Sequence, residues 1–224
     1  MNLLIFDLDG TLIDSKKDLA NSVNATRVHM GREPIDDEVV STWVGNGAPV
    51  LIRRAMGAEA SEQDVERALE YFLGYYREHM LDNTVLYPGV REGLDELRER
   101  QVRMAVLTNK PVRFSRDLVK GLGVGEHFFQ VYGGNSFDQK KPHPIGIETL
   151  RQEAGASPEQ TLMIGDSAVD IATARNAGVP SCGVTWGLQP ETLRAERPDL
   201  LVDRMEELTA FVLNGRRLGE IDEG

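Results

Sequence analysis

The sequence is poor in cysteine and has no long apolar run. Its 224 residues include a single cysteine, Cys182, so no intrachain disulfide can form. Cys182 lies in an apolar run, and we expect it to be a small core residue rather than a nucleophile. No apolar stretch approaches the roughly 18 residues of a membrane span. The chain opens with an apolar run and has no basic segment typical of a signal peptide, so we expect a cytoplasmic protein.

Basic residues are also scarce. There are 25 Lys and Arg residues against 36 Asp and Glu residues, which gives a formal net charge of −11. Nucleic acids and anionic membranes attract basic surfaces, so we expect neither as a partner. The hydrophobic content of 41% is ordinary for a globular chain with a buried core, in one large domain or two unequal ones. An anionic substrate would therefore need local positive charge from a metal ion, a lysine or a helix N-terminus.

The most informative stretch lies near the start of the chain. Leu3–Phe6 is an uninterrupted apolar run, which predicts a short strand buried on both faces, as in a parallel sheet. Asp7 and Asp9 follow at alternate positions and point the same way if the backbone stays extended, and Gly10 then permits a tight turn. Two neighbouring carboxylates are costly to bury without a cation, and Mg²⁺ prefers oxygen ligands. The alternative is a surface turn, because Asp and Gly are common turn residues.

A helical pattern follows this strand. Over residues 15–85 apolar residues recur at helical spacing, without any strand pattern, and Ser61 is placed to cap the longest helix. A glycine-rich turn, Gly45-Asn46-Gly47, interrupts the helices. We expect a small all-helical cap domain at 15–85, with linkers near 14–17 and 81–87.

From residue 86 onward, helices and strands alternate. The expected strands are 102–108, 128–132, 161–164, 181–185 and 200–202, and the expected helices are 89–100, 111–121, 144–154, 168–177 and 204–213. This alternation implies right-handed crossovers and a parallel sheet covered on both faces. We therefore predict an α/β fold: a Rossmann-like doubly wound core of residues 1–14 and 86–224, with the helical cap inserted. Residues 216–224 are polar, and we expect a loose tail there.

Polar residues follow several of the predicted strands. Thr108-Asn109 and Asp166 come directly after apolar runs, as Asp7 does. In open parallel sheets, ligands bind beyond the carboxyl ends of the strands, so these side chains should meet. Asp170, four residues past Asp166, shares its helix face if a helix begins by Asp166.

Positive charge for this acidic cavity comes from a proline-rich loop. Lys141 precedes Pro142, which favours an extended backbone for the lysine. The Thr108 hydroxyl and the Asn109 backbone N–H, near a helix N-terminus, favour an anion. A metal ion, a lysine, a hydroxyl and an amide together suit phosphate. A carboxylate can attack a phosphoryl group, and a second carboxyl two residues on can serve as acid and base.

These segments resemble the motifs of a known family. The four motifs of the haloacid dehalogenase superfamily are matched, in order, by Asp7-Leu-Asp9-Gly-Thr11, Thr108-Asn109, Lys141-Pro142 and Gly165-Asp166-Ser-Ala-Val-Asp170. The resemblance implies that Asp7 is the nucleophile and Asp9 the general acid/base, and that Thr108 and Lys141 bind phosphate.

The same resemblance implies a metal site. The Mg²⁺ ligands would be the Asp7 and Asp166 carboxylates and the Asp9 backbone carbonyl, with Asp170 behind them or joined through water. The acid at the position of Asp9 also distinguishes reaction types within the superfamily, because the true dehalogenases and the phosphonate-cleaving members lack it. A phosphatase is therefore favoured. Oxygen ligands alone do not distinguish Mg²⁺ from Mn²⁺ or Co²⁺.

A narrower resemblance concerns the substrate. Trp43–Ala48, Thr108–Pro111 and Lys141–Pro144 look like segments of bacterial phosphoglycolate phosphatases, which implies hydrolysis of 2-phosphoglycolate to glycolate and phosphate. Backbone amides around Gly45, Asn46 and Gly47 would then sense the carboxylate of the substrate. The alternative is that this loop is only a helix-breaking turn.

Other functions stay open. A pyrophosphatase or another small-phosphate phosphatase of the superfamily would share the motifs, and so would a β-phosphoglucomutase-like phosphomutase. A response-regulator receiver also has acids and a lysine around Mg²⁺, but it is about half this length and lacks the helical insertion. We expect a small phosphorylated metabolite as the partner, and a monomer or homodimer.

Overall fold

The computed structural model describes residues 1–214, and the tail expected at 216–224 lies outside the described residues. The main sheet has six parallel strands in the order β5-β4-β1-β6-β7-β8. Its strands are β1 (Leu3–Phe6), β4 (Arg103–Leu107), β5 (Gln130–Tyr132), β6 (Thr161–Gly165), β7 (Ser181–Val184) and β8 (Leu200–Val202). Helices α5 (Val90–Glu99), α6 (Val112–Gly121), α7 (Ile145–Ala154), α8 (Ala168–Ala177), α9 (Pro190–Glu196) and α10 (Met205–Leu213) flank it. The predicted fold class is confirmed.

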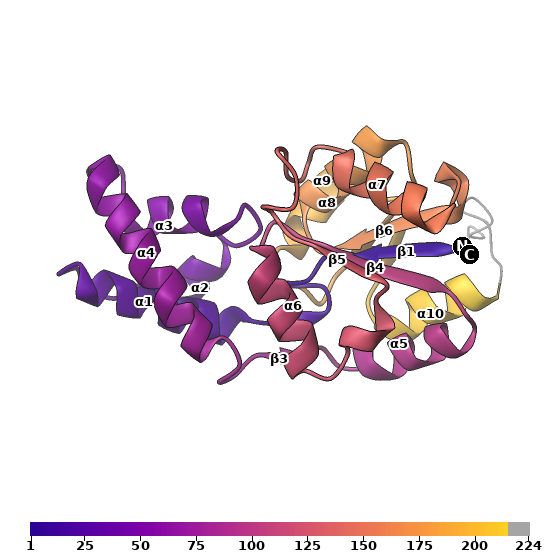
Figure 1. Ribbon diagram of the computed structural model, residues 1–224, viewed down its shortest axis with the longest axis horizontal. Coiled ribbons are helices and arrows are strands. Elements are labelled where there is room, and N and C mark those ends of the chain that lie inside the picture. The colour runs from indigo at the N-terminus through magenta and orange to yellow at the C-terminus, as the bar shows by residue number, and fades with distance from the viewer. Residues whose placement is uncertain (215–224) are drawn as a thin grey trace.

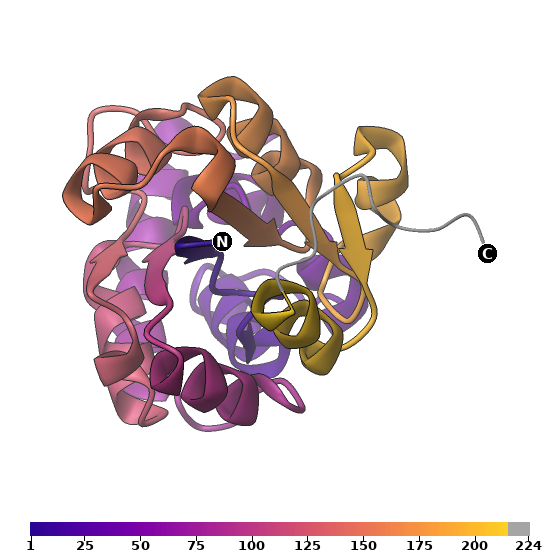
Figure 2. The ribbon, with the colours of Figure 1, turned by 90° about the vertical axis from the view of Figure 1, so that its right-hand side faces the viewer.

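Strand β1 lies at the centre of this sheet, between β4 and β6, and all four of its residues are buried. Its side chains alternate between the two faces. Leu4 and Phe6 pack with side chains of α5, α6 and α10, whereas Leu3 and Ile5 pack with side chains of α7 and α8. Figures 1 and 2 show helices on both sides of the sheet. A strand buried on both faces needs a continuous apolar run, and this explains the sequence of residues 3–6.

Some predicted boundaries differ from the structure. The helix expected to start at Pro111 starts at Val112, and Pro111 is its N-cap residue. The strand expected from residue 128 starts at Gln130, because a short 3-10 turn, η1 (Gly125–His127), precedes it. Helix α9 was not predicted. A second 3-10 turn, η2 (Pro158–Gln160), leads into β6.

The four remaining helices pack together beyond the carboxyl ends of the strands (Figure 1). They are α1 (Lys16–His29), α2 (Asp37–Ser41), α3 (Ala48–Met56) and α4 (Glu62–His79), called the helical block below. Ser61 caps α4 as predicted, because its side chain accepts a hydrogen bond from the Asp64 N–H. None of the helices within residues 1–214 has both the length and the apolar character needed to cross a membrane.

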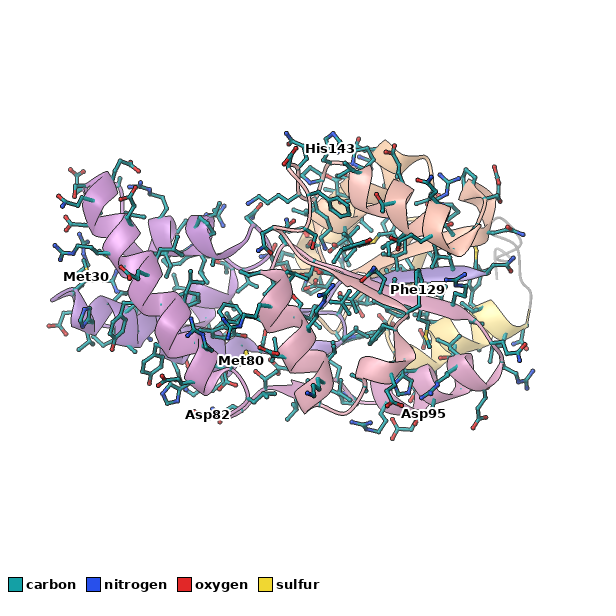
Figure 3. The ribbon with its side chains drawn as sticks, viewed as in Figure 1. Met30, Met80, Asp82, Asp95, Phe129 and His143 are labelled. Atoms are coloured by element: carbon teal, nitrogen blue, oxygen red, sulfur yellow. The ribbon has the colours of Figure 1, made fainter. Side chains whose placement is uncertain are left out.

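The chain passes between the sheet and the helical block twice, and the two passages are joined side by side. Strands β2 (Ile13–Asp14) and β3 (Val85–Leu86) form a small antiparallel ladder. The sequence analysis did not predict it, because a strand of two residues shows no periodicity. Figure 3 places Met80 and Asp82 where the second passage begins, at the end of α4. The two passages therefore form one double-stranded connection.

A buried carboxylate fixes this connection. Asp18, in the first turn of α1, is 1% exposed. It accepts hydrogen bonds from the Asn83 N–H at 2.9 Å and the Asn83 side-chain amide at 2.7 Å. The N–H and hydroxyl of Thr84 also donate to it, each at 2.8 Å. Burial alone would raise the pKa of Asp18, but these donors outweigh it and hold the pKa below its ordinary value.

We predict that Asp18→Ala lowers the free energy of unfolding by roughly 2–3 kcal/mol, because it leaves several buried donors without their charged acceptor. Since the folded-state pKa is lowered, the contribution is present above the unfolded pKa of about 4 and is lost as pH falls through the folded pKa. Urea unfolding of both proteins, from neutral pH down to about pH 3, should show the difference shrinking in acid.

The matched control is Asp82→Ala, which removes an exposed carboxylate that pairs with His79 in the same passage. Its cost should stay within about 0.5 kcal/mol. Equal losses in the two variants would contradict the assignment of the stabilisation to Asp18.

Candidate active site

Three carboxylates meet at the carboxyl ends of β1 and β6. Asp7 directly follows β1 and continues its ladder, since its N–H donates to the Ile164 carbonyl at 2.9 Å. Asp166 directly follows β6, and Asp170 lies in the first turn of α8. One oxygen from each carboxylate lies within 4.8 Å of the others, and all three residues are buried. The sheet order accounts for the meeting, because β1 and β6 are neighbours.

Asp166 and Asp170 do not share a helix face. A shared face required a helix that begins by Asp166, but α8 begins at Ala168 and Asp166 precedes it. Asp170 accepts from the N–H and the hydroxyl of Ser167 at 3.2 and 2.6 Å. Asp166 accepts from the N–H groups of Leu188 and Gln189 at 2.7 and 3.3 Å. Tertiary structure, rather than helical spacing, brings the two carboxylates together.

Lys141 is the cation nearest to this cluster. Its Nζ lies 2.9 Å from Oδ1 of Asp7 and 2.6 Å from Oδ1 of Asp170, and the lysine is buried. Burial favours its neutral form, but the two carboxylates outweigh this and hold the pKa of Lys141 above its ordinary value. Burial raises the pKa of Asp7 to about 6; Lys141 lowers this pKa and Asp170 raises it. Burial, followed by the charges of Asp170 and Asp7, places the pKa of Asp166 well above its ordinary value.

The carboxylate of Asp9 has different partners. Ser15 donates its hydroxyl to Oδ1 at 2.5 Å, and Lys110 Nζ lies 2.9 and 3.0 Å from the two carboxylate oxygens. Although burial opposes it, Asp9 holds the pKa of Lys110 above its ordinary value. Neither Lys110 nor Ser15 was predicted to have a role. Lys110 could have been noticed, because it follows Thr108-Asn109 directly at a strand end.

The charges of these groups indicate a cation site. Asp7, Asp9, Asp166 and Asp170 face two ammonium groups, those of Lys110 and Lys141, which leaves two more negative than positive charges. The donors are all oxygen, and burial first, then the neighbouring carboxylates, raise the pKa values of Asp7 and Asp166. A hard divalent cation such as Mg²⁺ fits such a donor set. The cluster could hold one.

Thr108 and Asn109 lie at the end of β4 and are both buried. The Thr108 hydroxyl lines the cavity described below and accepts from the Lys110 N–H at 3.3 Å. The Asn109 side-chain amide donates to the carbonyls of Gly45 and Lys141 at 3.0 and 3.1 Å. Asn109 thereby joins the helical block to the lysine loop, a contact that sequence reasoning did not foresee.

The loop Gly45–Gly47 contacts the core through its backbone carbonyls. The Lys140 ammonium donates to the Asn46 carbonyl at 2.7 Å. Gln189 donates its side-chain amide to the carbonyls of Thr42 and Val44 at 3.2 and 2.6 Å. Together with Asn109, these side chains hold the loop against the core. Gln189 had no signal in the sequence, because it lies in a polar turn before α9.

A cavity of about 40 Å³ lies between the core and the helical block. Its polar lining includes Asp7, Asp9, Thr108, Asn109, Lys110 and Tyr76, and its apolar lining includes Leu19, Val44, Leu51, Phe72 and Phe114. Gly45 and Gly47 lie at its wall. His143, omitted from the predicted site, is exposed at the outer surface of the core (Figure 3). Two carboxylates and Lys110 thus line a partly open, largely apolar cavity, and Lys141 contacts one of these carboxylates.

Comparisons with known proteins found related sequences and similar structures. Residues 4–184 match the family model described as haloacid dehalogenase-like hydrolase. A protein of Pseudomonas putida named phosphoglycolate phosphatase is 44% identical, over 92% of this chain and 78% of its own. One of the same name from Chromobacterium violaceum is 41% identical, over 94% and 96%. A crystal structure titled as a predicted phosphoglycolate phosphatase from Haemophilus somnus has a TM-score of 0.89 at 32% identity, covering 96% of this chain and 98% of that one.

Gly10 offers a test of the packing around Asp166. It has a φ of +83°, and a Cβ added there would lie 2.1 Å from Oδ2 of Asp166. We predict that Gly10→Ala lowers the free energy of unfolding by more than the roughly 1–2 kcal/mol that a left-handed backbone costs, and displaces Asp166. Urea unfolding measures the loss of stability, and the rate of hydrolysis of an aryl phosphate reports the displacement of Asp166.

Gly31→Ala is the matched control, since Gly31 has a φ of +70° and no atom lies within 4 Å of the position that a Cβ would take. Gly31→Ala should lower the free energy of unfolding only by the cost of the left-handed backbone, and it should leave turnover unchanged. Equal stability losses with intact activity in both variants would contradict the packing argument.

Proposed function

Because this chain belongs to the haloacid dehalogenase-like hydrolase family and is a phosphomonoester hydrolase, we propose that it converts 2-phosphoglycolate to glycolate and phosphate. The observation that carries the chemistry is the placement of Asp7 beside Lys141, with Asp7 lining the cavity. The names of the similar proteins from Pseudomonas putida and Chromobacterium violaceum support the assignment of 2-phosphoglycolate as the substrate. We also propose that residues 15–85 act as a cap on a core of residues 1–14 and 86–224, in a cytoplasmic monomer or homodimer.

Asp7 is the nucleophile in this proposal. Its carboxylate oxygen forms a bond to phosphorus while the bond from phosphorus to the glycolate oxygen breaks, which gives an aspartyl-phosphate. Lys141, 2.9 Å from Asp7, keeps the carboxylate ionised and neutralises the phosphoryl oxygens. Thr108 binds the same oxygens through its hydroxyl, and Asn109 fixes the loop that carries Lys141.

Asp9 transfers the proton. Its protonated form gives a proton to the departing glycolate oxygen, and its carboxylate then takes one from the water that attacks the aspartyl-phosphate. That second attack breaks the bond between the Asp7 oxygen and phosphorus and releases phosphate. Ser15 and Lys110 hold the Asp9 carboxyl in place through both steps.

Mg²⁺ fits the oxygen cluster. The carboxylates of Asp7 and Asp166 and the backbone carbonyl of Asp9 would hold it, with Asp170 behind them or as a further ligand. When bound, the ion supplies positive charge that lowers the repulsion between the phosphate and the acidic residues. Two backbone N–H donors fix Asp166 for this role, and Ser167 fixes Asp170.

The cavity favours a compact substrate. Its volume of about 40 Å³ suits a two-carbon leaving group better than a sugar or nucleoside. Gly45 and Gly47 line it on the side of the helical block, and in this proposal the loop of Gly45, Asn46 and Gly47 contacts the substrate.

We predict that phosphate release from a panel of small phosphates is greatest, in kcat/KM, for 2-phosphoglycolate. The panel should include pyrophosphate, β-glucose 1-phosphate and nucleotide monophosphates. Chelation of divalent ions should abolish turnover and added Mg²⁺ should restore it, because the acidic cluster would otherwise repel the phosphate. A flat profile, or pyrophosphate at the top, would overturn the substrate but not the chemistry of Asp7.

We predict that Asp7→Asn retains less than about 1% of wild-type turnover, because the amide cannot attack phosphorus. Phosphate release measures this, and circular dichroism checks the fold. Asp82→Asn, at an exposed carboxyl far from the cavity, is the control and should keep full activity. Substantial turnover by Asp7→Asn would argue against a covalent aspartyl route.

A further inference from the structure

The hydroxyl of Tyr76 is a buried polar group that the proposed reaction leaves unused. Tyr76, on α4 of the helical block, is 1% exposed and lines the same cavity as Asp7 and Asp9. Among residues 1–214, its hydroxyl oxygen has no hydrogen bond of normal geometry, and the Lys110 ammonium is the nearby donor that acts on its pKa. Burying an unpaired hydroxyl costs free energy, so a ligand that pairs with it gains affinity.

Packing fixes the ring that carries this hydroxyl. The Tyr76 ring stacks on Phe72, with centroids 5.6 Å apart, and meets Phe114 edge-on at 5.5 Å. Burial raises the pKa of Tyr76 to about 12, although Lys110 lowers it. Tyr76 is therefore a rigid, neutral donor at neutral pH.

A buried cation lies beside the Tyr76 ring. Lys110 Nζ is 4.6 Å from the ring centroid while it contacts both carboxylate oxygens of Asp9. An ammonium group has three N–H donors, so it can serve Asp9 and a ligand in the cavity together. Both the lysine and the tyrosine line the cavity.

The nearby walls are apolar, with Leu19, Leu51 and Phe72 among their residues. A carboxylate entering such a space must be matched by donors, or its desolvation is not compensated. We propose that the Tyr76 hydroxyl and the Lys110 ammonium bind the carboxylate of the leaving group and so select 2-phosphoglycolate. This assignment rests on the proposed function and adds to it the residues that recognise the carboxylate of the substrate.

The arrangement ties recognition to catalysis. Lys110 would contact the substrate carboxylate and Asp9, the proposed proton donor, at the same time. Tyr76 comes from the helical block and Lys110 from the core, so both donors meet the ligand only when the block covers the cavity. A phosphate ester without a second anion would leave the hydroxyl unpaired and be turned over less efficiently.

The first experiment compares 2-phosphoglycolate with 2-hydroxyethyl phosphate, which has a hydroxyl in place of the carboxylate. Tyr76→Phe removes one oxygen and keeps the ring that packs on Phe72 and Phe114. It should lower kcat/KM for 2-phosphoglycolate at least about ten times more than that for 2-hydroxyethyl phosphate, the scale of a hydrogen bond to a charged group. Tyr75→Phe is the matched control, because Tyr75 stacks on His79 and does not line the cavity; it should leave both values unchanged.

The second experiment measures binding without turnover. Calorimetry with Mg²⁺ present compares 3-phosphonopropionate, a non-hydrolysable analogue with a carboxylate, with propylphosphonate, which lacks one. The wild type and Tyr75→Phe should bind the carboxylate analogue at least about tenfold more tightly, and Tyr76→Phe should lose most of this preference.

The two proposals fail in different ways. If Tyr76→Phe weakens both analogues equally, or neither, the carboxylate site is wrong even when 2-phosphoglycolate is the preferred substrate. If the preference for the carboxylate analogue disappears in Tyr76→Phe but the wild type hydrolyses another phosphate better, the site stands and the proposed substrate is wrong. An unchanged melting temperature in Tyr76→Phe excludes a general loss of structure.

Discussion

The burial of several carboxylates around one lysine is the constraint on which the rest of the site depends. Asp7, Asp166 and Asp170 lie close enough to repel one another strongly in a space with little water, and Lys141 compensates only part of their charge. The surrounding backbone is packed to keep them there. A Cβ on Gly10 or Gly187 would lie 2.1 or 2.2 Å from atoms of Asp166, so neither position has room for a side chain. The fold therefore holds an arrangement that its own charges oppose, and a bound divalent cation would relieve that repulsion.

The two acids near the end of β1 differ because their partners differ. The Asp7 carboxylate lies against Lys141 from the proline-rich loop, whereas Asp9 is bonded by Ser15 and by Lys110 from the end of β4. Two carboxylates separated by a single residue thus belong to two separate networks. Such a division suits a reaction in which one carboxylate attacks and the other moves a proton, because each can change charge with its own cation nearby.

Much of this site follows from the sequence, and the reason is periodicity. A polar residue directly after a buried strand must lie at the carboxyl edge of a parallel sheet, which places Asp7, Thr108 and Asp166 without any coordinates. The contacts that hold the helical block are different in kind. Asp18 meets Asn83 and Thr84 across more than sixty residues of chain, and Gln189 meets carbonyls of the loop before Gly45 from a polar turn. No local pattern encodes such pairs, because their geometry exists only once both segments have folded.

These contacts also determine where the cavity can open at least cost. The loop carbonyls of Gly45 and Asn46 are held by single hydrogen bonds from Asn109 and Lys140, each worth about 1 kcal/mol net near a wet surface. The passages at β2 and β3 are held by a buried charge with several donors, whose loss costs more. Glycolate must leave and water must enter between the two proposed chemical steps. Gln189 adds two hydrogen bonds just before this loop, but none of the loop contacts involves a buried charge like that of Asp18. The loop is therefore the contact that would separate more readily to admit water.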